Sequence, residues 1–140
     1  DWPSWFDCTH NFVRHETHDG PPLWVHRKGA CSARHHERAI VPGSMGSRSF
    51  HVEGRGVDDA MSSCSHGAGR RLPRGEAMRT IRASDVERQL EGVFFDRANR
   101  AALRDEAPSA YKDIGAVMRA QRDLVRIVRT LRPVLAFKGA

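Results

Sequence analysis

The sequence predicts an α+β fold, with strands in the first half and helices in the second. Residues 11–53 mix apolar, β-favouring side chains with polar ones, between turn-forming glycines and prolines. From residue 76 onward the apolar positions follow helical spacing instead. The 140 residues suffice for one modest domain with its own core.

The expected strands come first in the chain. Residues 11–16 and 23–27 are each typical of a strand, and residues 18–22 between them contain Asp-Gly followed by Pro-Pro, which favours a turn. Residues 47–53 alternate apolar and polar side chains and predict a third strand. Residues 54–69 are rich in glycine and serine and are expected to be mostly loop.

Short helices are expected next, over residues 76–80 and 85–92. Ser84 is a plausible N-cap of the second helix, and Glu87 three residues later completes a capping box. Residues 99–108 are polar and predict a loop.

A long amphipathic helix is expected over residues 113–132, ended by Pro133 and followed by a last strand over residues 134–138. Its apolar positions are Ile114, Val117, Met118, Leu124, Val125, Val128 and Leu131. Four arginines lie on its other faces: Arg119, Arg122, Arg126 and Arg129. These arginines indicate either an RNA-facing basic surface or the ordinary solvated face of a helix.

Composition narrows the classes of function. A net charge of +6 favours polyanionic partners such as nucleic acid, although a solvated basic surface gives the same count. No apolar run reaches about 18 residues, so no membrane span is expected. The three cysteines are odd in number and widely spaced, which indicates a reducing, cytoplasmic location.

The start of the chain carries two further indications. It begins with Asp1 where a complete protein would have methionine, so it looks like the continuation of a longer protein. The opening Asp1-Trp2-Pro3 has neither a basic nor an apolar signal region, so no signal peptide is expected.

Imidazole chemistry is confined to the first half, because all eight histidines lie there. The densest candidate is Ser65-His66-Gly67-Ala68-Gly69-Arg70, where the glycines leave peptide N–H groups free to face phosphate oxygens. Arg70 and Arg74 can each clamp phosphate with two hydrogen bonds. The same residues are also compatible with a glycine-rich turn around a structural histidine.

Two other segments offer polar groups. Pro42-Gly43-Ser44-Met45-Gly46, followed by Ser49, can line a nucleotide pocket or form an ordinary tight turn. Asp7-Cys8-Thr9-His10-Asn11 contains metal-ligand residue types, but one or two ligands do not make a site.

These segments together resemble the C-terminal region of the RtcB family of RNA ligases. The matching stretches, in family order, are residues 10–13, 24–30, 42–46, 65–70, 110–113 and 138–139. The resemblance implies that residues 1–140 are the C-terminal portion of a larger mixed sheet-and-helix fold whose N-terminal portion is absent.

The resemblance also implies roles for individual residues. His66 would be the nucleophile that takes GMP from GTP, and His10 would bind manganese. The guanine nucleotide would be held by Asn11, Ser44, Ser49, Gly67, Ala68, Gly69, Tyr111 and Lys138. Tyr111 can stack on the base, and Lys138 can meet its polar edge. Arg70 and Arg74 would hold RNA phosphate.

Other residues in these stretches receive no catalytic role. His26 is expected to be a structural histidine near the core, and no ligand role is expected for Cys8. The remaining histidines are expected at the surface: His15, His18, His35, His36 and His51. Pro73 stands where the family commonly has serine, which removes a hydroxyl and a backbone donor and puts phosphate binding there in question.

The implied activity is the joining of an RNA 3′-phosphate or 2′,3′-cyclic phosphate to a 5′-hydroxyl in tRNA splicing or RNA repair. GTP and Mn²⁺ are the implied cofactors. The implied partners are RNA (tRNA halves or broken RNA), the missing N-terminal portion and an archease-like activator. A non-catalytic RNA- or partner-binding module is the main alternative, and a metal-dependent hydrolase is a weaker one.

The family's other metal ligands lie upstream of this region, so the chain alone is expected to be inactive. It is also expected to be poorly stable, with an exposed apolar patch formed by Trp2, Trp5, Phe6 and Trp24.

Overall fold

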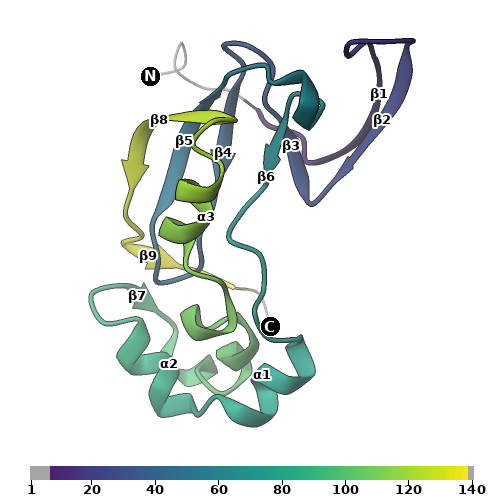
Figure 1. Cartoon of the computed structure of the whole chain (residues 1–140). Coiled ribbons are helices and arrows are strands. Elements are labelled where there is room, and N and C mark those ends of the chain that lie inside the picture. Colours follow the sequence, from purple (N-terminus) through teal and green to yellow (C-terminus); the bar gives the residue numbers. More distant parts are fainter. Residues whose placement is uncertain (1–6, 139–140) are drawn as a thin grey trace.

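The computed structural model describes residues 7–138 and confirms the α+β class, with most strands in the first half and the helices in the second (Figure 1). The strands are β1 (Asn11–Glu16), β2 (Leu23–Lys28), β3 (Ala30–Ser32), β4 (Arg38–Val41), β5 (Ser49–Gly54), β6 (Ser63–Ser65), β7 (Phe94–Phe95), β8 (Val125–Leu131) and β9 (Leu135–Ala136). The α-helices are α1 (Arg74–Thr80), α2 (Ala83–Gln89) and α3 (Ile114–Ala120). Short 3₁₀ helices are η2 (Asp58–Ala60), η3 (Arg97–Asn99), η4 (Ala102–Glu106) and η5 (Pro108–Ala110).

The first two expected strands are confirmed as an antiparallel hairpin. Strands β1 and β2 pair from Asn11 opposite Lys28 to Glu16 opposite Leu23. The hairpin extends away from the other strands, and β3 leads from it back to β6 (Figure 1). Strands β3 and β6 are antiparallel, so the hairpin and the segment that ends at Ser65 are joined through this short sheet.

The central sheet has the order β4-β5-β8, and β5 confirms the third expected strand. Helix α3 packs on this sheet, and its buried residues Ile114 and Met118 belong to the same hydrophobic core as Val52. Segment 54–69 is mostly loop, as expected, but also contains η2 and β6.

The long helix expected over residues 113–132 is wrong. Helix α3 ends at Ala120, and the chain then forms strand β8 beside β5. Asp113 caps α3 by accepting hydrogen bonds from the N–H groups of Gly115 and Ala116. The β8 sequence Val-Arg-Ile-Val-Arg-Thr-Leu is rich in β-branched residues, and pairing with β5 satisfies its backbone. Only the first residue of β8 is buried, so both faces of this edge strand are exposed along most of its length.

The helical region contains the two short helices expected from the sequence, with earlier starts. The N-cap of α2 is Arg82, and the Asp85 carboxylate accepts from the Arg82 N–H at 3.3 Å. The expected Ser84–Glu87 capping box is therefore wrong by two residues.

The segment expected to be a polar loop, residues 99–108, is wrong as well, because most of it is 3₁₀ helix. Its apolar residues Leu103 and Ala107 are buried in a second hydrophobic core, separate from the one between α3 and the central sheet. The members of that core are Met45, Ala77, Ile81, Val86, Leu90, Phe95, Leu103, Ala107 and Ala110.

The last expected strand is present as β9, which pairs in parallel with β7. Within residues 7–138, none of the helices is long and apolar enough to cross a membrane.

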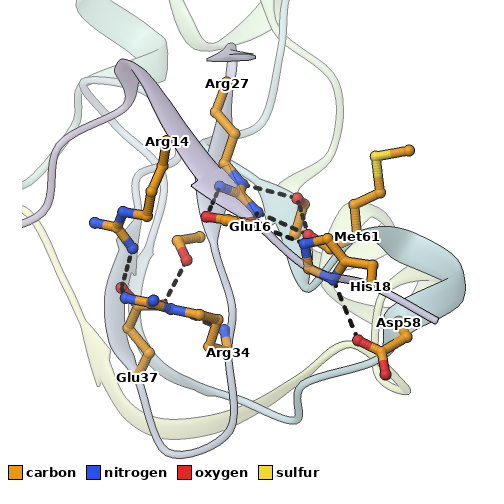
Figure 2. Close-up of polar contacts among 10 residues, drawn as sticks. Arg14, Glu16, His18, Arg27, Arg34, Glu37, Asp58 and Met61 are labelled. Carbon is orange, nitrogen blue, oxygen red and sulfur yellow. Dashed lines mark hydrogen bonds and ion pairs between the residues drawn. The ribbon is translucent and has the colours of Figure 1, made fainter. Parts of the chain in front are cut away.

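A buried polar cluster joins the hairpin to η2. Arg27 is only 2% exposed and donates two hydrogen bonds, each of 2.7 Å, to the Glu16 carboxylate. His18 lies between Glu16 and Asp58, at 2.8 and 3.2 Å from their oxygens (Figure 2). The hydrogen bonds from Arg27, aided by His18, lower the pKa of Glu16 to about 2 although burial acts in the opposite direction. The bond to Glu16 and then that to Asp58 raise the pKa of His18 above its usual value.

This cluster predicts a pH dependence of folding stability. Because the pKa of Glu16 falls from 4.5 to about 2 on folding, its contribution is present above pH 4.5 and is lost as the pH falls below that value. A shift of this size corresponds to roughly 3 kcal/mol. The contribution of His18 has the opposite sign: it is present below about pH 6.5 and is lost as the pH rises further.

Denaturant unfolding from pH 2 to pH 9 measures this dependence. The substitution Glu16→Gln should flatten the loss of unfolding free energy on the acid side, whereas the surface control Glu91→Gln should retain it. An unchanged acid-side slope in Glu16→Gln would contradict the assignment.

Candidate functional site

Two histidines that are far apart in sequence face each other. The rings of His10 and His66 are nearly parallel, with an interplanar angle of 22° and centroids 5.5 Å apart. His10 directly precedes β1, and His66 directly follows β6. Gly29, between β2 and β3, lies against the same ring: a Cβ atom at this position would be 3.9 Å from Cε1 of His66. The β1–β2 pairing places His10 near Gly29, and the β3–β6 pairing places His66 there as well, so the two pairings together bring the imidazoles side by side.

The two glycine-containing loops predicted separately are in contact. The Ala68 N–H donates to the Pro42 carbonyl at 3.0 Å. A Cβ atom at Gly67 would lie 3.1 Å from the same carbonyl oxygen, which is tight enough to favour glycine. Gly69 has a φ of +70°, a backbone conformation that other residues rarely adopt. The stretch that contains His66 thus rests on the loop that contains Ser44.

The serines of this second loop hold its own backbone. The Ser47 hydroxyl accepts from the Ser44 N–H at 2.6 Å and lies 2.8 Å from the Ser44 hydroxyl. The Ser49 hydroxyl accepts from the Gly43 N–H at 3.4 Å. Ser44 and Ser49 both contribute to this loop, and Ser47 is an additional hydroxyl that the sequence pattern did not single out.

Tyr111 is held beside the same glycine loop. The Lys112 N–H donates to the Gly69 carbonyl at 3.0 Å. The Arg70 guanidinium lies 5.0 Å from the centre of the Tyr111 ring and donates to its hydroxyl at 3.2 Å. Tyr111 also lines a cavity of about 450 Å³ together with Ser47. This cavity connects Tyr111 to the serine loop.

Glu106 is the centre of a charged cluster that the sequence analysis missed. Its carboxylate accepts from the Tyr111 hydroxyl at 2.6 Å and lies 2.9 Å from Arg74. Lys138 and Arg70 lie 3.5 and 3.6 Å from it. Burial alone would raise the pKa of Glu106, but Tyr111, Lys138 and Arg74 together lower it below its usual value. Burial and the bond to Glu106 raise the pKa of Tyr111.

The two arginines expected to hold RNA phosphate already have carboxylate partners. Arg74 pairs with Asp105 at 2.8 Å as well as with Glu106, and its side chain is 68% exposed. Arg70 also donates to the Asp105 carbonyl. Both arginines belong to one surface with Tyr111 and Lys138, and a phosphate would compete with these carboxylates for them.

Asn11 and Pro73 each lie at the start of an element, β1 and α1 respectively. Asn11 is exposed at the start of β1, opposite Lys28. Pro73 is the N-cap of α1, and its carbonyl accepts the first helical hydrogen bond from Ala77.

A metal site is not complete within the part of the chain that the structure describes. Among residues 7–138, no group of three or more histidine, cysteine, aspartate or glutamate side chains is placed to hold an ion. His10 is exposed beside His66, and the Cys8 sulfur contacts the Cys31 sulfur at 3.8 Å. These residues alone do not fit a manganese centre, although His10 can supply one ligand to ligands from elsewhere.

Two expectations about other histidines are wrong. His26 is exposed on β2, because Val25 and Arg27 occupy the inward face of that strand. The His18 side chain is only 8% exposed, because it lies between two carboxylates.

Comparison with known proteins identifies the class of protein. The RNA-splicing ligase RtcB of Escherichia coli K12 is 47% identical over 134 residues, which cover 95% of this chain and 32% of the relative. The RNA-splicing ligase RtcB of Mycobacterium tuberculosis is 36% identical, covering 96% of the chain and 36% of the relative. The tRNA-splicing ligase RtcB of Methanopyrus kandleri is 34% identical, covering 96% and 16%. These relatives carry the names of RNA ligases.

The family model described as tRNA-splicing ligase RtcB matches residues 2–139. The chain therefore belongs to the RtcB family. It spans about one third of the length of the bacterial relatives named above.

Proposed function

We propose that this chain provides the nucleotide-accepting part of a GTP- and manganese-dependent RNA ligase. The proposed reaction joins an RNA 3′-phosphate to a 5′-hydroxyl through a GMP–histidine intermediate on His66. The observation that carries the proposal is the contact between His10 and His66, beside a loop surface that contains Ser44 and Tyr111. Family membership and the names of the relatives support the ligase class.

The proposed chemistry begins at His66. A ring nitrogen attacks the α-phosphorus of GTP, a nitrogen–phosphorus bond forms, and pyrophosphate leaves. An oxygen of the RNA 3′-phosphate then takes the GMP from His66. Finally the 5′-hydroxyl oxygen attacks the 3′-phosphorus, loses its proton and displaces GMP, which leaves a phosphodiester. A 2′,3′-cyclic phosphate would first be opened to a 3′-phosphate.

The other residues would bind and orient the reactants. The N–H groups of Gly67, Ala68 and Gly69 would face phosphate oxygens, and Asn11, Ser44 and Ser49 would add polar contacts. Tyr111 would stack on guanine, with Lys138 at its polar edge. Arg70 and Arg74 would exchange their carboxylate partners for RNA phosphate. His10 would be one of several manganese ligands, the others being supplied from outside this chain.

The partners would be RNA ends, such as tRNA halves, and an archease-like activator, in the cytoplasm. A direct test uses an E. coli chimera, in which this chain replaces the matching segment of the E. coli relative. With GTP and manganese, the chimera should join RNA with a 3′-phosphate to RNA with a 5′-hydroxyl. Ligation of RNA that ends in a 3′-hydroxyl, or ligation without GTP, would contradict the proposal.

A non-catalytic RNA- or partner-binding module is the second candidate. It is favoured by one observation, the absence of a complete ligand set for a metal within residues 7–138. Its signature would be retention of RNA by the chimera without any transfer of GMP. The same observation argues against a metal-dependent hydrolase assembled from the histidine-rich half of the described residues.

Guanine binding should depend on the Tyr111 ring. In the chimera, Tyr111→Ala should raise the GTP concentration required for GMP transfer by roughly 5- to 150-fold, because base stacking on an aromatic ring contributes about 1–3 kcal/mol. Tyr111→Phe is the matched control: it retains the ring and removes only the hydroxyl bonded to Glu106. An equal loss in both variants would assign the effect to the hydroxyl instead of stacking.

A further inference from the structure

Residues 24–30 form one of the stretches that match the family, but they have no role in the chemistry proposed above. This stretch contains Arg27, the largest fully buried side chain among the described residues. Burial of an arginine is unfavourable unless the charge is paired and its donors are satisfied. Glu16 meets the charge with two parallel hydrogen bonds, both within the β1–β2 hairpin. This fork of bonds fixes the orientation of the guanidinium plane.

The remaining donors of Arg27 leave the hairpin. Its Nε donates to the Ser63 hydroxyl at 2.9 Å, and its second terminal nitrogen donates to the Met61 carbonyl at 2.7 Å. Figure 2 shows Arg27 between Glu16 on one side and Met61 on the other. The Ser63 hydroxyl itself donates to the Met61 carbonyl at 2.8 Å, which completes a closed network. One side chain therefore binds the hairpin to the first residue of β6.

Each end of this network lies within three residues, along the chain, of one of the two facing histidines. On the hairpin side, the Arg27 guanidinium lies 5.6 Å from the centre of the Phe12 ring, and Phe12 is two residues from His10. On the other side, β6 runs from Ser63 to Ser65, and His66 follows. Arg27 thus spans the two segments whose relative position sets the 5.5 Å spacing of the imidazole rings.

We propose that Arg27 is a positioning residue that fixes His10 relative to His66, and that Glu16 and Ser63 are the anchors through which it acts. This inference rests on the proposed function for the roles of the two histidines. Arginine suits this role because its planar guanidinium can donate hydrogen bonds to Glu16 and to Ser63 at the same time. A lysine ammonium is a single flexible point charge.

The decisive variant is Arg27→Lys, which keeps the positive charge beside Glu16 and removes the fork. The matched control is Arg14→Lys, which alters an arginine that also lies over the Phe12 ring, at 4.9 Å, but pairs with Glu37 instead of β6. In the E. coli chimera, Arg27→Lys should lower kcat for GMP transfer to His66 by at least about tenfold, since a misplacement of 1 Å can cost ~100-fold. KM for GTP should change less than about twofold, because the groups proposed to bind guanine are not contacted by Arg27.

A second readout does not depend on activity. In the E. coli chimera with isotope-labelled histidine, nuclear Overhauser effects between the ring protons of His10 and His66 report their spacing. They should weaken in Arg27→Lys and persist in Arg14→Lys. If Arg27→Lys does not fold, Ser63→Ala removes only the anchor on β6 and should show the same pattern to a smaller extent.

The outcomes separate the two proposals. Unchanged ring contacts and unchanged kcat in folded Arg27→Lys and Ser63→Ala would overturn the positioning role. Equal losses of kcat in Arg27→Lys and Arg14→Lys would also overturn it. Absence of GMP on His66 in the unmodified chimera would instead remove the proposed function, and the ring contacts would still decide whether Arg27 sets the spacing.

Discussion

Replacement of His66 by alanine should abolish RNA joining by the E. coli chimera. The imidazole is the proposed nucleophile, and removing an enzyme nucleophile costs on the order of 1,000-fold or more in rate. The substitution should be tolerated by the fold, because the ring is only partly buried and contacts His10 and the Gly29 region. Ligation and GMP transfer, followed with labelled RNA and labelled GTP, should both fall to background.

A matched control separates loss of the nucleophile from loss of the ring contact. His15→Ala removes another exposed histidine, one on β1 whose ring contacts Trp24 at a tilted angle and does not face His66. It should leave both steps close to their original rates. GMP transfer at the original rate in His66→Ala would show that another group is the nucleophile.

The 140-residue chain alone should show neither tight manganese binding nor GMP transfer. Among residues 7–138 no ligand set for a metal is complete, and the single imidazole of His10, which faces His66, cannot alone hold manganese in a defined geometry. Calorimetry with Mn²⁺ and labelling with GTP test the two parts separately, and the chimera provides the positive control. Tight manganese binding together with GMP transfer by the chain alone would contradict the proposal, because it would require a complete site within these residues.

The chain alone is also predicted to be poorly stable. Large apolar side chains with exposed fractions of 72–83% include Trp24, Phe94, Val134 and Phe137. Such surface favours association in solution. The other members of the expected aromatic patch, Trp2, Trp5 and Phe6, lie outside the described residues. Denaturant unfolding and light scattering should show low stability and aggregation relative to the chimera.

Local patterns predicted the elements that local chemistry determines. The Asp-Gly and Pro-Pro turn between β1 and β2 predicted the hairpin, and helical spacing predicted α1 and α2 to within three residues. The failure at residues 113–132 has a physical cause. Apolar residues of segment 124–131 fit a helical period, but the β-branched residues of β8 pair with β5 instead. Tertiary pairing thus outweighed a local pattern.

The site was predictable only in part. Sequence patterns leave each loop ambiguous, and the roles proposed for His10 and His66 come from the resemblance to the family. The contacts between Pro42 and Ala68, and between Gly69 and Lys112, depend on long-range folding that spacing does not reveal. Arg27 was overlooked although the two-residue period of a strand places it on the buried face beside Val25. The position of Glu106 is not evident from the sequence, because segment 99–108 has the composition of a polar loop whereas Ala102–Glu106 forms a 3₁₀ helix.

The central claim is that His66 carries the GMP, and mapping the modified residue tests it most directly. The E. coli chimera would be incubated with labelled GTP and manganese, digested under conditions that preserve nitrogen–phosphorus bonds, and sequenced by mass spectrometry. We predict the GMP adduct on the peptide that contains Ser65-His66-Gly67 and its loss in His66→Ala. An adduct on a lysine or on another histidine, with His66 unmodified, would contradict the account.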